Sequence, residues 1–180
     1  DAELVFAGYG IVAPEYGWND YAGLDMRGKI AVVLVNDPGF ATQDPKLFTG
    51  NAMTYYGRWT YKYEEALRQG AAGLFVVHET KPAGYPWEVV RNGSASQIDL
   101  RIDDYATQRL ALEGWMTQEA AQRVLALAGE DYEQLKRAAS DRKFRPRPLG
   151  VKASVGVRND VKFSTTYNVV GVLPGSKRPA

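Results

Sequence analysis

The chain contains one histidine, His78, and no cysteine, which limits the chemistry that its side chains can perform. A catalytic zinc ion takes three protein ligands, often several of them histidines, and a two-metal site takes more. His78 alone cannot assemble such a centre, and no Gly-x-Ser-x-Gly elbow supports a Ser-His-Asp triad. The spacing of the early acidic residues is not that of a calcium loop; these are Asp20, Asp25, Asp37 and Asp44. We therefore predict no catalytic residue and no metal ligand here, and a structural role for His78.

A glycine motif near the amino terminus resembles a dinucleotide fingerprint. Gly8-Tyr9-Gly10-Ile11-Val12-Ala13 matches the G-x-G-x-x-A pattern and follows a strand-like run. That motif binds a pyrophosphate only when a helix starts at its second glycine. Pro14, Gly17 and Asn19 oppose a helix at this place. We predict that the glycines permit a bend at the end of the strand and that the chain binds no nucleotide cofactor.

Aromatic residues form the most distinctive candidate surface. Tyr55, Tyr56, Arg58 and Trp59 combine large rings with an interleaved arginine, as the hot spots of protein contacts do. Aromatic residues are equally common in cores, so burial and partner contact both stay open for these four. The same two alternatives apply to Tyr85 and Trp87, which lie near the tip of a Pro- and Gly-rich loop.

Composition indicates a globular domain and makes two classes of partner improbable. The 180 residues are 45% hydrophobic and carry a net charge of +1, so no strong field attracts nucleic acid or anionic lipid. No apolar run approaches the roughly 18 residues of a membrane span. The chain starts at Asp1 and enters a strand-like run at Leu4, so we expect a segment of a longer protein.

The hydrophobic pattern predicts an α/β domain with six or seven strands and three helices. Residues 60–69 have the helical period, with Gly70 closing the helix, between two apolar runs that read as parallel strands. Thr117 and Asp131 are predicted caps of two further helices, the first ended by Gly129. The predicted strands are 3–9, 30–36, 71–77, 110–116, 151–157, 161–165 and 167–173, the fifth and sixth forming a hairpin; 79–99 is predicted irregular.

Four stretches of the chain resemble the protease-associated domain of bacterial zinc-dependent aminopeptidases related to glutamate carboxypeptidase and transferrin receptor. They are LVFAGYGIVAPEYGWNDYAGLDMRGKIAVVLVNDPG, AMTYYGRWTYKYEEALRQGAAGLFVVHE, AGYPWEVV and YNVVGVLPGSKRP. The features with most weight are Gly8-Tyr9-Gly10, the Asp20-Tyr21 turn and the Gly70-Ala71-Ala72-Gly73 entry to a strand.

The resemblance implies a swivelling β/β/α fold, in which a twisted sheet closes toward a barrel with flanking helices. It implies a protease-associated domain over residues 1–174 and a linker over 175–180. It further implies a secreted or periplasmic parent whose catalytic domain holds two zinc ions, with no family zinc ligand in this chain. By the same resemblance the domain contacts that catalytic domain, leans over its cleft and limits which peptide substrates enter, with Tyr55, Tyr56, Arg58 and Trp59 facing the cleft.

Two other functions stay open from the sequence. Protease-associated domains also serve in cargo and sorting receptors, so the chain can be a stand-alone module that binds protein or peptide. An enzyme that uses His78 or the glycine loop is the third alternative, and specific binding of NAD, ATP or Zn²⁺ would raise its melting temperature.

Overall fold

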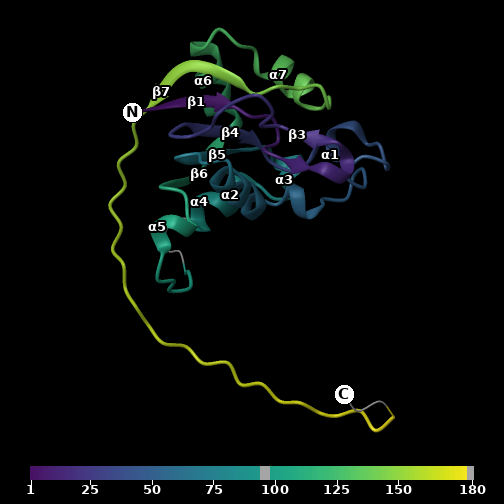
Figure 1. Ribbon diagram of the computed structural model, residues 1–180, viewed down its shortest axis with the longest axis vertical. Helices are drawn as coiled ribbons and strands as arrows, with labels where there is room; N and C mark the ends of the chain where they lie inside the picture. Colours follow the sequence, from purple (N-terminus) through teal and green to yellow (C-terminus); the bar gives the residue numbers. More distant parts are fainter. Residues whose placement is uncertain (94–97, 178–180) are drawn as a thin grey trace.

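The computed structural model describes residues 1–93 and 98–177, which are built around a five-stranded sheet (Figure 1). The strand order is β6-β5-β4-β1-β7. Four strands are parallel, and the last is antiparallel to β1. Their bounds are β1 Ala2–Phe6, β4 Ile30–Leu34, β5 Gly73–His78, β6 Leu112–Thr117 and β7 Arg147–Ala153. A separate short hairpin pairs β2 (Val12–Ala13) with β3 (Trp18–Asn19).

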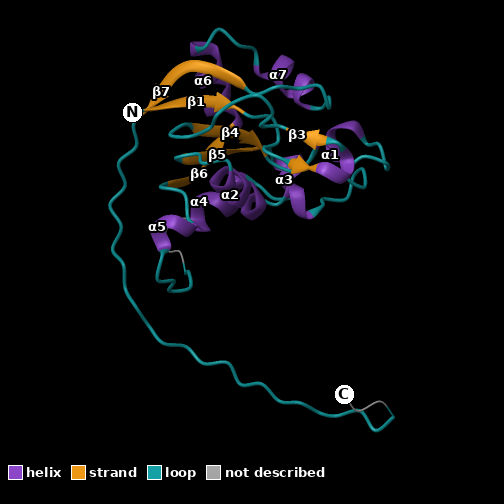
Figure 2. Cartoon of the chain, in the orientation of Figure 1, coloured by secondary structure: helices purple, strands orange, loops and turns teal. Residues whose placement is uncertain are grey.

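Helices cover both faces of the sheet, which explains why its central strands are apolar throughout. In β4, Ile30, Val32 and Leu34 belong to one hydrophobic cluster, and Ala31 and Val33 belong to another. The first cluster includes residues of α6 (Gln118–Leu127) and α7 (Tyr132–Ala139), and the second includes residues of α2 (Trp59–Arg68). Figure 2 shows α2 and the α6–α7 pair on opposite sides of the strands. Neither face of β4 is exposed to solvent, so apolar and polar residues do not alternate along it.

The three main helices form where the sequence predicts them. Helix α2 connects the parallel strands β4 and β5, and Gly70 follows it at φ +77°. Thr117 Oγ1 accepts a hydrogen bond from the Ala120 N–H at 3.2 Å, and Asp131 Oδ1 accepts one from the Gln134 N–H at 2.8 Å. Both predicted caps are therefore confirmed, as is the mixed α/β class.

The prediction that residues 79–99 are irregular is wrong in part. The segment contains α3 (Thr80–Ala83) and α4 (Trp87–Gly93). Pro82 lies in the first turn of α3, where no intrahelical N–H bond is lost, and Pro86 directly precedes α4. Further short helical segments are α1 (Pro38–Thr42), α5 (Tyr105–Gln108), and the 3₁₀ turns η1 (Pro14–Tyr16) and η2 (Tyr55–Gly57).

The sheet does not close toward a barrel. Its outer strands, β6 and β7, stand at opposite ends of the strand order and do not pair. This expectation came from the resemblance and is corrected by the observed topology, in which consecutive parallel strands add on one side of β1 and a single antiparallel strand adds on the other. The finer assignment to a protease-associated fold stays a proposal.

The predicted strands at 161–165 and 167–173 are absent from the described residues, and β7 already ends at Ala153. Residues 154–177, here called the tail, extend from the body without helix or strand (Figure 1). Val169 is 100% exposed and Leu173 is 96% exposed. The residues have the apolar pattern of a strand, but a strand forms only where another backbone accepts and donates its hydrogen bonds. The hairpin prediction is therefore wrong as well.

The helices of the described residues are all too short or too polar to cross a membrane.

Candidate functional site

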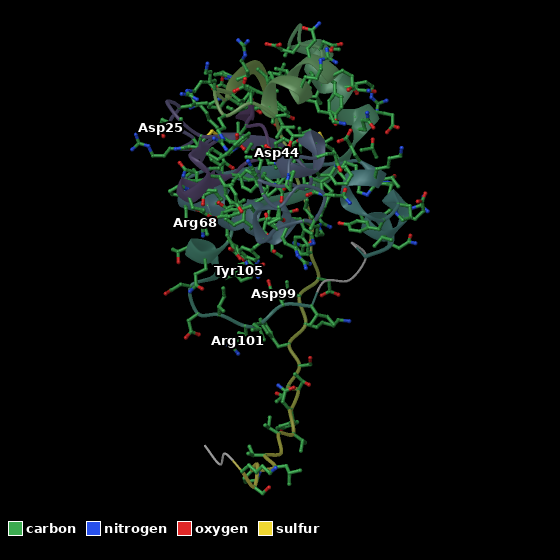
Figure 3. All side chains as sticks on the ribbon, turned by 90° about the vertical axis from the view of Figure 1, so that its right-hand side faces the viewer. Asp25, Asp44, Arg68, Asp99, Arg101 and Tyr105 are labelled. Atoms are coloured by element: carbon green, nitrogen blue, oxygen red, sulfur yellow. The ribbon has the colours of Figure 1, made fainter. Side chains whose placement is uncertain are left out.

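The candidate site lies where the parallel strands β1, β4 and β5 end. Because these strands share a direction, the segments that follow them meet at one edge, here called the carboxyl edge. Ligands of open parallel sheets bind at this kind of edge. In Figure 1 the arrowheads of β1 and β4 point toward it, and α1 lies beside it. Figure 3 looks onto this side of the molecule, with Asp44 of the loop after α1 near the middle of the body.

A pocket of about 560 Å³ opens at the carboxyl edge. Its volume lies within the range of roughly 300–1,000 Å³ that is typical of small-molecule sites. One part of its lining is apolar and includes Phe40 and Pro82. The other part is polar and ionisable: it includes Tyr9, Asp37, Glu79, Glu133, Lys136 and Arg137.

Asp37 forms part of this lining and holds two loops together. Its side chain is fully buried at the N-cap of α1, and Oδ1 accepts a hydrogen bond from the Gly39 N–H at 3.1 Å. Oδ2 accepts from the Thr54 N–H at 3.0 Å and from Thr54 Oγ1 at 2.7 Å. Burial raises the pKa of this carboxyl group, and these hydrogen bonds oppose the rise. Asp37 therefore fixes the pocket wall and has few lone pairs left for a ligand.

Lys62 of α2 is buried behind the pocket with no exposed surface. Its ammonium group donates three hydrogen bonds to backbone carbonyls: 2.6 Å to Tyr9, 2.9 Å to Asn36 and 3.2 Å to Tyr56. An ammonium group has three N–H donors, so all of them are used. This lysine joins the ends of β1 and β4 to the aromatic segment before α2.

Asp20 holds the glycine motif in its bend. Its Oδ2 accepts hydrogen bonds from the backbone N–H groups of Tyr9 at 3.1 Å and Ile11 at 3.0 Å. Its Oδ1 accepts one from Trp18 Nε1 at 2.8 Å. Gly10 has φ +65°, and a Cβ there would lie 2.8 Å from Val33 Cγ1. The predicted bend is confirmed, since Gly8 at φ +56° and Gly10 at φ +65° both have the left-handed backbone conformation that favours glycine.

Asp20 and Lys62 form a buried pair of opposite charge. Burial raises the pKa of Asp20 to about 7 and lowers the pKa of Lys62 to about 7, and the charge of each opposes the shift of the other. Sequence reasoning did not single out Lys62. The signal that could have found it is its position between Tyr61 and Tyr63 on a helix, four residues before Ala66 of the apolar face.

The side of the pocket nearest α7 contains a second set of buried polar groups. Glu79 is 8% exposed, and its Oε1 accepts a hydrogen bond from Lys136 Nζ. Burial, and after it the charge of Glu79, raises the pKa of Tyr132, whose hydroxyl is buried without a hydrogen-bond partner among the described residues. Burial also raises the pKa of Tyr9.

The predicted contact residues Tyr55 and Tyr56 differ in their surroundings. Tyr55 is 58% exposed, and its hydroxyl lies 3.0 Å from both carboxylate oxygens of Glu64. Tyr56 is half-buried against the rings of Phe48 and Tyr61, and its hydroxyl donates to Glu15 at 2.6 Å. Of these two rings, only that of Tyr55 is largely available to a partner.

Arg58 and Trp59 both lie on the surface. Arg58 is exposed, and Trp59 is 43% exposed with its ring edge-on to Tyr63 at 5.7 Å. Trp59 lines a second pocket, of about 210 Å³, together with Glu64 and Glu113.

Tyr85 and Trp87 form a different cluster, around His78. The His78 side chain is 4% exposed, and its Nε2 lies 3.0 Å from the carbonyl oxygen of Tyr85. The rings of Tyr85 and Trp87 are each 5.6 Å from the imidazole, and that of Trp115 is 6.0 Å away. His78 is thus a packed side chain at the end of β5, in agreement with a structural role.

Neither residues 1–93 nor residues 98–177 contain a group of three or more His, Cys, Asp or Glu side chains arranged to hold a metal ion. Comparisons of the chain with protein-family models, curated proteins and solved structures found no match.

Proposed function

We propose that the chain is a non-catalytic accessory domain of a secreted or periplasmic zinc metallo-aminopeptidase, in which it covers the active-site cleft and governs the access of peptides. The proposal starts from the resemblance of four long sequence stretches to protease-associated domains. In this proposal the two zinc ions belong to the catalytic domain, and the partners of this chain are that domain and the peptide substrate.

The observation that carries the proposal is the exposure of the tail. Residues 167–173 read YNVVGVL, which is the composition of a buried strand, yet Tyr167, Val170 and Val172 are each at least 84% exposed. Contiguous exposed apolar surface of this kind is typical of a surface that contacts another folded unit. A strand of a neighbouring domain in the same polypeptide would account for both the pattern and the absence of a partner within the described residues.

The position of Tyr55, Arg58 and Trp59 is consistent with a role in peptide access. Exposed aromatic rings beside an exposed arginine are the side chains that contribute most to protein contacts. They lie in η2 and at the start of α2, and Lys62 ties this segment to the carboxyl edge through the Tyr56 carbonyl.

The experiment uses the full product of the gene. It is assayed for hydrolysis of aminoacyl amides and of peptides of increasing length, with and without a zinc chelator. We expect chelator-sensitive release of amino-terminal residues, and we expect Trp59→Ala and Arg58→Ala to raise KM or alter the preference for peptide length. Arg142→Ala, an exposed residue that the proposal does not use, is the matched control. Hydrolysis that is absent, or kinetics identical in all three variants, would overturn the proposal.

A second candidate is a stand-alone receptor-type module that binds protein or peptide. The pocket at the carboxyl edge favours it, because a site formed entirely by this chain needs no catalytic domain to be complete. The two functions differ in one measurement. A stand-alone module binds its partner when expressed alone, and its full gene product has no aminopeptidase activity.

A further inference from the structure

The carboxyl-edge pocket has a feature that the proposed function does not use: charges of both signs without partners at its opening. Glu133 and Arg137 both line the pocket from α7. Neither side chain forms an ion pair or side-chain hydrogen bond with another described residue, and both are exposed. Residues four apart on a helix have their Cβ atoms about 5–6 Å from each other. The pocket therefore presents a free carboxylate and a free guanidinium side by side.

The other charged groups of the pocket are already paired or hydrogen-bonded, so Glu133 and Arg137 are the charges left to contact a ligand. Lys136 pairs with Glu79, and the oxygens of Asp37 accept three hydrogen bonds. Two further buried polar side chains line the pocket: Asn36, which donates a hydrogen bond to the Pro82 carbonyl oxygen at 2.8 Å, and Tyr9, whose pKa is raised by burial. A ligand with a single charge would neutralise one of the two free groups and leave the other beside its apolar part.

We infer that this pocket binds a small zwitterion, an α-amino acid or the end of a short peptide. Arg137 meets the ligand carboxylate, because a guanidinium forms paired hydrogen bonds with a carboxylate. Glu133 meets the ammonium group. Phe40 and Pro82 supply an apolar wall for an aliphatic side chain. The inference does not depend on the proposed peptidase function, since all these groups belong to this chain.

The test is a titration of the chain with small probes, in which binding is measured by calorimetry or by the NMR shifts of the residues around the pocket. The probes are L-leucine and the dipeptide Leu-Gly, which are zwitterions, together with N-acetyl-leucine and leucinamide, which each retain one charge. We expect saturable binding of at least one zwitterion. The matching single-charge analogue should bind at least about tenfold more weakly, since a hydrogen bond to a charged group contributes roughly 1.5–3 kcal/mol. Preference for leucine over Leu-Gly identifies a free amino acid as the ligand, and the reverse identifies a peptide end.

Two variants assign the charges. Arg137→Gln should weaken the binding of the zwitterion about tenfold but leave leucinamide unaffected, and Glu133→Gln should do the same with N-acetyl-leucine unaffected. Both side chains are exposed, so the variants should fold, which the thermal midpoint verifies. Arg142→Gln, exposed and outside the pocket lining, is the control. Absence of saturable binding up to about 10 mM, or equal affinity for N-acetyl-leucine and leucine, would overturn the inference. Either result leaves the peptidase proposal standing, because that proposal is judged by hydrolysis.

Discussion

The carboxyl edge buries charged side chains, whereas the tail exposes apolar ones. Only the buried charges of the edge have partners among the described residues. At the edge, Lys62 and Asp20 are charged groups in the interior, and each is met by three hydrogen-bonding partners. In the tail, Val169 and Leu173 are apolar groups that stay in solvent.

The buried charges of the edge have their hydrogen-bonding partners among the described residues, whereas the apolar side chains of the tail are exposed. Burying an unpaired charge is unfavourable by several kcal/mol, so the edge is stable only because its partners are part of the same fold. Exposed apolar surface has no such compensation in the tail. The buried charges of the edge are therefore satisfied within the fold, whereas the proposed function assigns the partner of the tail to another domain, and the following predictions test each half.

The largest expected effect is at Lys62. Lys62→Met removes the ammonium group and leaves three carbonyls and the Asp20 carboxylate buried without their cation. We expect a loss of about 3–5 kcal/mol in the free energy of unfolding, measured by urea denaturation. Lys81→Met, at an exposed position of α3, is the control and should change stability by less than about 0.5 kcal/mol. If Lys62→Met is as mild as the control, the edge is not held together by its buried charge.

The second prediction concerns the coupling between the two buried charges. Asp20→Asn and Lys62→Met each leave an opposite charge uncompensated, whereas the double variant leaves neither. Its loss of stability should therefore be smaller than the sum of the single losses, by about 0.5–3 kcal/mol. Lys62→Met combined with Asp131→Ala is the reference pair, because the α7 cap shares no hydrogen-bond partner with Lys62, and its effects should add within about 0.5 kcal/mol. Strict additivity for Lys62 and Asp20 would show that they are independent.

The sequence predicts best the elements whose causes are local. The capped helices α6 and α7 and the helix α2 before Gly70 follow from short-range chemistry, and the apolar runs of β4 and β5 follow from burial on both faces. The Pro- and Gly-rich composition of 79–99 predicts irregular structure, although proline is compatible with the first turn of a helix, as at Pro82, and with the position before one, as at Pro86.

The site was harder to predict because its parts meet only in the folded chain. Lys62 contacts carbonyls 53, 26 and 6 residues away, and no local pattern indicates which carbonyls these are. The open sheet was missed because the order of its strands is a tertiary property. The predicted tail strands failed for a related reason: an apolar run shows that a segment fits a sheet, but it does not show that a neighbouring strand is present.

A smaller effect is expected at the cap of α7. Asp131→Ala removes the acceptor of the Gln134 N–H and should cost about 1 kcal/mol, measured by urea denaturation. Asp131→Asn keeps a capping oxygen and should remain within a few tenths of a kcal/mol of the original chain. A loss as large as that of Lys62→Met would mean that this locally specified helix also depends on long-range contacts.

The smallest expected effect on stability belongs to the tail. A chain that ends at Ala153 retains β7 complete. It loses the contact of the Arg101 guanidinium with the Phe163 ring at 5.2 Å and the hydrogen bond that Ser154 Oγ donates to Asp1 Oδ1. In Figure 3 the tail passes beside Asp99 and Arg101. An exposed cation–π contact contributes about 0.5–1 kcal/mol, so the thermal midpoint should fall by no more than about 4 °C.

The same shortening should have a clear effect on association, because it removes the exposed apolar run. We expect the full chain to self-associate at high concentration in sedimentation experiments, and the shortened chain to stay monomeric. Val169→Lys with Val172→Lys in the full chain should abolish association without changing the midpoint, since both side chains are in solvent. A fall of ten degrees or more on shortening would show that the tail packs against the body, and the boundary expected at residue 174 would then mark the end of the folded domain.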